Sequence, residues 1–113
     1  MLTNSSLLKE HGYVNGKWVG DDAESRFDVK NAYTNEVIST LPEMGKKETD
    51  EAINAANEAW PDWRSRTAKE RAIILKKWFD LIMENQEDLA ILMTAEQGKP
   101  LAEARGEVGY GAS

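Results

Sequence analysis

The chain has 113 residues, and its 14 lysines and arginines against 20 aspartates and glutamates give a net charge of −6. This acidic balance argues against a nucleic-acid partner, because a protein that binds the phosphate backbone needs a basic face. The absence of cysteine excludes disulfides, thiolate metal sites and a cysteine nucleophile from this sequence. No apolar run approaches the ~20 residues that cross a bilayer and the first ten residues lack a secretory signal, so we expect a cytoplasmic protein without membrane partners.

The first part of the chain, up to residue 42, is predicted to form strands and turns. Asn15 and Gly16 lie between two short extended stretches and accept the positive φ angles of a type I′ turn, which predicts a two-residue hairpin. A second hairpin is predicted from residues 27–29 and 36–41, which are joined by turn-forming residues.

Residues 46–113 are predicted to be helical. The first helix has apolar residues at spacings of three and four, namely Ala52, Ile53, Ala56, Ala59, Trp60 and Trp63. Pro61 is expected to end or kink this helix, because proline has no N–H to donate.

A second helix is predicted to begin with a capping box formed by Thr67 and Glu70. Its apolar residues are Ile73, Ile74, Leu75, Trp78, Phe79, Leu81, Ile82 and Met83. They cover most of the helix circumference, so we expect this helix to be enclosed on several sides. A third helix is predicted from Asn85, and it places Leu89, Leu92 and Met93 inward.

A fourth helix is predicted after Gly98, which suits the C-terminal cap of the third helix, with Pro100 as its first residue. Gly106, Gly109 and Gly111 weaken this helix by up to ~1 kcal/mol each relative to alanine. The sequence ends there without a cap or polar tail, so we interpret the chain as truncated.

Few side chains suggest chemistry by themselves. His11 is the only histidine and is interpreted as an ordinary surface residue, because one histidine without cysteine cannot build a closed metal shell. One group of acidic residues, Glu48, Asp50 and Glu51, is interpreted as the start of a helix. A second group, Glu84, Glu87 and Asp88, is interpreted as a solvated helix face.

The glycines near the end of the sequence have the spacing G-x-x-G-x-G, the reverse of the dinucleotide-binding fingerprint, and no strand precedes them. We therefore attribute them to close helix packing. Taken alone, the residues describe an acidic α/β module without visible catalytic groups.

Several strings, in order, resemble the N-terminal region of the aldehyde dehydrogenase superfamily. The most distinctive is residues 93–104, MTAEQGKPLAEA; residues 14–18 are similar to the family's early hairpin, and residues 31–37 are similar to its N-P-x-T-G-E-V turn. Residues 52–71 are similar to its A-x-x-A-x-x-x-W…R helix pair. Within the superfamily, the chain looks most like the bacterial NAD(P)-dependent succinate-semialdehyde dehydrogenases. Two departures, Ala32 for proline and Asn35 for glycine, imply a less rigid turn.

The resemblance implies an α/β fold in which β-hairpins precede helices, with residues 1–113 forming the first part of a cofactor-binding domain. It implies an oxidoreductase that uses NAD or NADP on a small aldehyde and forms a homo-oligomer when complete. The family's cysteine nucleophile and glutamate base would lie outside this chain, so we assign no catalytic and no cofactor-binding residue here. We expect the 113-residue chain alone to be inactive.

The resemblance also implies two sites. In some relatives a monovalent cation lies against backbone at positions matching Val29 and Lys30, and against an acid matching Glu96. Tyr110 is expected to approach the substrate tunnel of the complete enzyme.

Two other interpretations stay open. The chain could be a fragment of a glutarate-semialdehyde dehydrogenase, whose sequences look alike in this region. It could instead be a stand-alone acidic interaction module whose apolar helix, residues 71–83, docks a partner. If the chain is a fragment, we expect exposed apolar surface and self-association.

Overall fold

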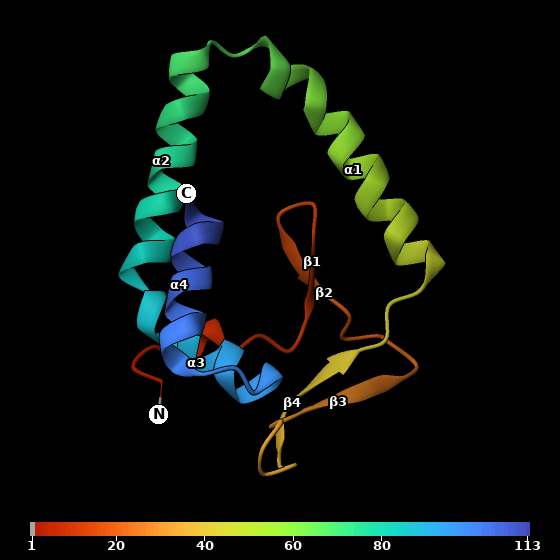
Figure 1. Cartoon of the computed structure of the whole chain (residues 1–113). Helices are drawn as coiled ribbons and strands as arrows, with labels where there is room; N and C mark the ends of the chain where they lie inside the picture. The colour runs from red at the N-terminus through yellow and green to blue at the C-terminus, as the bar shows by residue number, and fades with distance from the viewer. Residues whose placement is uncertain (1) are drawn as a thin grey trace.

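The computed structural model describes residues 2–113 and contains two β-hairpins followed by four α-helices, as the fold-class prediction requires (Figure 1). The elements are a short 3₁₀ turn η1 (Ser5–Leu7), strands β1 (Gly12–Val14), β2 (Lys17–Val19), β3 (Arg26–Lys30) and β4 (Val37–Pro42), and helices α1 (Lys46–Ser65), α2 (Ala68–Glu84), α3 (Gln86–Gln97) and α4 (Leu101–Ala112). Each strand pair forms its own antiparallel two-stranded sheet. Among the described residues, none of the helices is both long and apolar enough to span a membrane.

The first hairpin confirms the predicted turn. Asn15 and Gly16 have φ angles of 50° and 75°, the positive values of a type I′ turn. Tyr13 pairs with Trp18 across the strands, and their ring centroids lie 4.9 Å apart. The hairpin is thus held by its turn geometry and by one aromatic pair.

The second hairpin also forms where it was predicted, between β3 and β4. Its turn is organised by Asn31, whose side-chain oxygen accepts hydrogen bonds from the backbone N–H groups of Tyr33 and Thr34 at 2.9 and 3.0 Å. The register shifts between Val29 and Lys30, which marks a β-bulge or similar irregularity at the end of β3.

Helix α1 continues through Pro61 to Ser65, so of the two effects predicted for Pro61, an end or a kink, the helix end is not found. Proline leaves the carbonyl of the residue four positions earlier, Asn57, without its helical donor. Asn57 is exposed, so water can supply the missing hydrogen bond. No residue of α1 is buried.

The core lies where α3 and α4 pack together. Ala90, Ala104 and Val108 are buried, and Ile82, Leu89, Met93 and Leu101 pack against them. The inward positions predicted for Leu89 and Met93 are therefore confirmed, and Leu92 is half-buried. The small buried residues allow the two helices to approach closely.

Helix α4 extends to Ala112 despite its three glycines, because its buried face packs on α3. Gly98 caps α3 in the left-handed conformation, with a φ of 82°, as predicted. Pro100 is the N-cap of α4 and not its first residue.

The enclosure predicted for α2 is not found in this chain. None of its residues is buried, and Ile73 and Trp78 are 62% and 63% exposed. Figure 1 shows α1 and α2 as the two arms of an open arch, with α4 beside the C-terminal part of α2. The radius of gyration is 16.6 Å, compared with about 13 Å for a compact domain of this length.

Candidate functional site

An apolar groove lies between α2 and the end of α4. It has a volume of about 680 Å³. Helix α2 contributes Leu75, Lys76, Trp78, Phe79 and Ile82, and the end of the chain contributes Gly111, Ala112 and Ser113. Four of the α2 residues, Leu75, Trp78, Phe79 and Ile82, recur at helical spacings of three and four, so they form one stripe along the helix.

The charged residue at this groove, Lys76, already has a partner. Its Nζ donates to both side-chain oxygens of Asp80, at 2.9 and 3.1 Å, and lies 6.0 Å from the ring centroid of Phe79. The groove therefore presents apolar surface, and the charge of the lysine that lines it is already paired.

Tyr110 does not line this groove. It is 85% exposed near the end of α4, next to Gly111, which does line it. The described residues alone thus place the tyrosine ring in solvent.

The residues predicted to hold a monovalent cation lie on neighbouring elements. The loop after β3 meets the end of α3, because the N–H of Ala32 donates to the carbonyl of Ala95 at 2.9 Å. Val29 and Lys30 flank the register shift, where ladder hydrogen bonding is locally disrupted, and Glu96 is an exposed side chain directly after Ala95. In residues 2–113, no group of three histidine, aspartate or glutamate side chains is placed to hold a metal ion.

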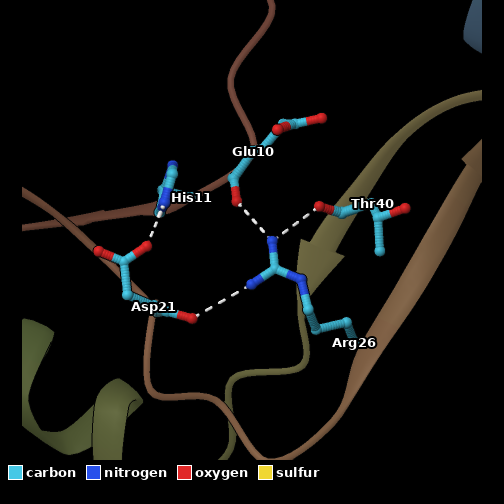
Figure 2. A network of polar contacts seen from close by, with 6 residues as sticks. Glu10, His11, Asp21, Arg26 and Thr40 are labelled. Carbon is cyan, nitrogen blue, oxygen red and sulfur yellow. Dashed lines mark hydrogen bonds and ion pairs between the residues drawn. The ribbon is translucent and has the colours of Figure 1, made fainter.

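His11 has a partner that the sequence did not reveal. Its Nε2 lies 2.7 Å from Oδ1 of Asp21, and its side chain is 35% exposed. The pair lies beside the guanidinium of Arg26, as Figure 2 shows.

Arg26 holds three separate backbone segments together. Its guanidinium donates to the carbonyls of Glu10 at 3.1 Å, Gly20 at 3.3 Å and Thr40 at 2.9 Å (Figure 2). These carbonyls belong to the N-terminal arm, the end of the first hairpin and β4. The cluster of His11, Asp21 and Arg26 therefore joins the two hairpins.

Asp88 was predicted to lie on a solvated face, and this is wrong. It is 5% exposed, and its carboxylate accepts the N–H groups of Thr3 at 2.9 Å and Asn4 at 2.6 Å. These hydrogen bonds lower the pKa of Asp88, against the opposing effect of desolvation. Sequence patterns could not show this role, because the donors lie more than eighty positions away.

Other carboxylates have similarly structural roles. The Arg105 guanidinium donates hydrogen bonds to the Glu87 carboxylate at 2.6 and 2.8 Å, and these bonds tie α3 to α4. They lower the pKa of Glu87 and raise the pKa of Arg105. Glu48 accepts the N–H of Gly45 at 2.8 Å, so its predicted capping role is confirmed, and backbone hydrogen bonds lower its pKa.

The glycines of α4 do not form a phosphate-binding loop. Gly106, Gly109 and Gly111 all lie within the helix, where no strand-to-helix turn exists. The described residues therefore offer no cradle of this kind for a dinucleotide. The predicted close packing is also not seen within this chain at Gly106 and Gly111, where an added Cβ would meet nothing within 4 Å.

Residues 18–113 match the model of the "Aldehyde dehydrogenase family". Over 112 residues, or 99% of the chain, the sequence is 53% identical to the glutarate-semialdehyde dehydrogenase of Pseudomonas putida (strain KT2440) and 51% identical to the NADP-dependent succinate-semialdehyde dehydrogenase of Escherichia coli (strain K12). The chain spans 23% of the length of each. The fold is similar to the crystal structure of succinate-semialdehyde dehydrogenase from Burkholderia pseudomallei, with a TM-score of 0.94 and 50% identity over 99% of this chain and 23% of that one.

Proposed function

The chain belongs to the aldehyde dehydrogenase family, and from that premise we propose that the full-length protein oxidises succinate semialdehyde to succinate with NAD or NADP. In this reaction the aldehyde, water and the oxidised cofactor give the carboxylate, the reduced cofactor and two protons. The observation that carries the proposal is the similarity to two semialdehyde dehydrogenases over 99% of the chain. Both relatives are named for aldehydes that also carry a carboxylate, which supports that substrate class.

The 113 residues contribute structure and not chemistry to this reaction. They contain no cysteine to attack the aldehyde, and the dinucleotide would supply the hydride acceptor from outside them. Their polar clusters, at Arg26, Asp88 and Arg105, hold backbone segments and helices in place. We therefore assign to this region the role of positioning the surfaces on which the rest of the protein folds.

The test uses the full-length protein with succinate and glutarate semialdehydes, each with NAD and with NADP. We expect kcat/KM for succinate semialdehyde to exceed that for glutarate semialdehyde at least roughly tenfold, a difference within the range that one methylene can produce. The reverse ratio would assign the glutarate activity instead. No NAD(P)H absorbance with either aldehyde would overturn the proposal.

The matching control is the 113-residue chain under the same conditions. We expect no NAD(P)H absorbance from it, and clear turnover would contradict the assignment of the chemistry to the rest of the protein. A stand-alone interaction module is disfavoured by the family membership.

Two further sites of the full-length protein are part of the proposal. Backbone carbonyls at Val29 and Lys30, with the carboxylate of Glu96, would hold a monovalent cation, supported by the irregular end of β3 and its contact with α3. Tyr110 would approach the substrate tunnel. In the full-length protein, Glu96→Gln should weaken the stabilisation by K⁺ or Na⁺, measured as a melting temperature against salt, with choline chloride as the control.

We also place the full-length protein in the cytoplasm as a homo-oligomer that acts on a small-molecule aldehyde.

A further inference from the structure

The turn of the first hairpin contains a chemically labile pair of residues. Asn15 and Gly16 are the only Asn-Gly pair in the sequence, and both are exposed in the turn between β1 and β2. Apart from the chain neighbours, an added Cβ at Gly16 would meet only the hydroxyl of Tyr13, at 4.0 Å. Open space therefore surrounds the backbone at Gly16, and water reaches the side-chain amide of Asn15.

An asparagine that precedes a glycine can react with its own backbone. The backbone nitrogen of Gly16 attacks the side-chain carbonyl carbon of Asn15, the new C–N bond closes a five-membered imide, and the side-chain nitrogen leaves as ammonia. Water then opens the imide at either carbonyl and gives aspartate or isoaspartate. The net change converts one amide and one water into a carboxylate and ammonium, and glycine favours the attack because it has no Cβ that blocks its nitrogen.

A second exposed asparagine shows what the glycine adds. Asn35, in the turn of the second hairpin, has a φ of 61°, close to the 50° of Asn15. The next residue is Glu36, whose N–H donates to Oγ1 of Thr34 at 3.3 Å. The two asparagines thus share exposure and backbone conformation, but the nitrogen that would attack Asn35 carries a bulky side chain and is held by a hydrogen bond.

The strands of the first hairpin control access to this reaction. Ring closure requires a rotation about the Cα–C bond of Asn15, and the paired strands hold the turn in its type I′ geometry against that rotation. The ring centroids of Tyr13 and Trp18 lie 4.9 Å apart, and Nζ of Lys9 lies 4.8 Å from the Trp18 ring centroid. Because a two-stranded hairpin is marginally stable in water, the turn opens transiently by local unfolding.

We propose that Asn15 is a site of spontaneous deamidation, with water as the co-reactant, and that the contact between Tyr13 and Trp18 limits the rate by keeping the turn closed. The aspartate product keeps the hairpin, because Asp-Gly also suits a type I′ turn. The isoaspartate product adds a methylene to the backbone, which disrupts the pairing of Val14 with Lys17 next to the turn. Either product adds negative charge to a chain whose net charge is already −6.

The test is incubation of the full-length protein at neutral pH, followed by peptide mapping with mass spectrometry. We expect conversion of amide to acid at Asn15 to be at least roughly tenfold faster than at Asn35, because glycine leaves the attacking nitrogen open. Isoaspartate and aspartate should both form at Asn15, since the imide opens at either carbonyl.

A variant of the aromatic pair tests the control of the rate. In Trp18→Ala, conversion at Asn15 should be faster by a factor of about two to five, as expected for the loss of one cross-strand aromatic pair. The rate at Asn35 in the same sample should stay unchanged, which distinguishes opening of the first hairpin from global unfolding. Tyr33→Ala, which removes a 95% exposed ring from the second hairpin, is the control and should not change the rate at Asn15. If Trp18→Ala does not fold, Lys9→Gln replaces it, with an expected increase of about twofold from the lost cation–π contact.

Each other outcome overturns the proposal. Conversion at Asn15 that is no faster than at Asn35 removes the role of the glycine. Aspartate without isoaspartate indicates direct hydrolysis of the side-chain amide, without the imide. An unchanged rate at Asn15 in the folded hairpin variant shows that the aromatic pair does not keep the turn closed. The result is independent of the proposed activity, because the peptides are read without substrate or cofactor.

Discussion

At the scale of single residues, the structure depends on a few groups that reach across the chain. Asp88 binds the N-terminal arm, Arg26 joins the hairpins, and Gly20 lets the first hairpin approach β4. Asp88 and Arg26 bind backbone atoms of segments distant in sequence, and Gly20 lies against the Pro42 side chain, so each can be tested by one substitution.

Replacing Asp88 by asparagine should release the N-terminal arm. The charged acceptor of two backbone N–H groups is lost, so amide exchange at Thr3 and Asn4 should be roughly tenfold faster at neutral pH, measured by NMR. Asp50→Asn, in an exposed ion pair with Lys46, is the control and should leave these amides unchanged.

The same substitution should change the pH dependence of stability. Because the folded state lowers the pKa of Asp88, its contribution is present above the ordinary aspartate pKa of about 4 and is lost as the pH falls through the folded value. The difference in Tm between the unmodified chain and Asp88→Asn, measured by circular dichroism, should therefore be larger at pH 7 than at pH 2.5. If the difference in Tm were the same at both pH values, the pKa of the Asp88 carboxylate would not differ between the folded and unfolded states.

Gly20→Ala should destabilise the chain by about 1–3 kcal/mol. Gly20 has a φ of 112°, and an added Cβ would lie 2.5 Å from Cγ of Pro42. The measurement is urea unfolding followed by tryptophan fluorescence. Gly106→Ala is the matched control, because that glycine is helical with open space around it, and it should stabilise by up to ~1 kcal/mol. Equal effects at the two glycines would contradict both explanations.

At the scale of elements, local signals and packing contribute differently to each helix. The capping box of α2 forms as predicted, with the N–H of Glu70 donating to Oγ1 of Thr67 at 3.3 Å and the N–H of Thr67 donating to the Glu70 carboxylate at 2.7 Å. Helix α4, by contrast, depends on packing against α3 to compensate for its glycines. Helix α2 is thus stabilised at its start by local sequence, whereas α4 is stabilised by tertiary packing.

Because α2 has no buried residue, its N-terminal cap should matter more than usual. Thr67→Ala should cost about 1 kcal/mol and reduce helicity, measured by circular dichroism at 222 nm during thermal unfolding. Thr67→Ser keeps the hydroxyl and should retain most of the stability. If serine and alanine have the same effect, the hydroxyl is not the stabilising group.

At the scale of the whole molecule, the 113 residues form a small core with two long exposed arms. Among the described residues the hydrophobic core consists of Ala90, Ala104 and Val108, and the radius of gyration exceeds that of a compact domain. The exposed apolar face of α2 is therefore available to whatever molecule offers a matching surface.

The isolated chain should accordingly self-associate. We expect the apparent mass of the isolated chain in sedimentation velocity to rise with concentration. In the Trp78→Lys variant this rise should need a concentration at least roughly threefold higher, because the substitution places a charge in the apolar groove. Tyr33→Lys, on the isolated hairpin tip, is the control and should have little effect. A concentration-independent monomer would contradict the exposure of this face.

The amino-acid sequence by itself determined the local elements: the Asn15-Gly16 turn, the capping box at Thr67 and the Gly98 cap all follow from backbone preferences of neighbouring residues. Only the tertiary structure decided the role of Asp88, the partner of His11 and the three carbonyls of Arg26, because these contacts join positions that no short motif connects. It also decided that α2 lies open: periodicity shows which residues are apolar, but burial depends on what other surface is present to cover them.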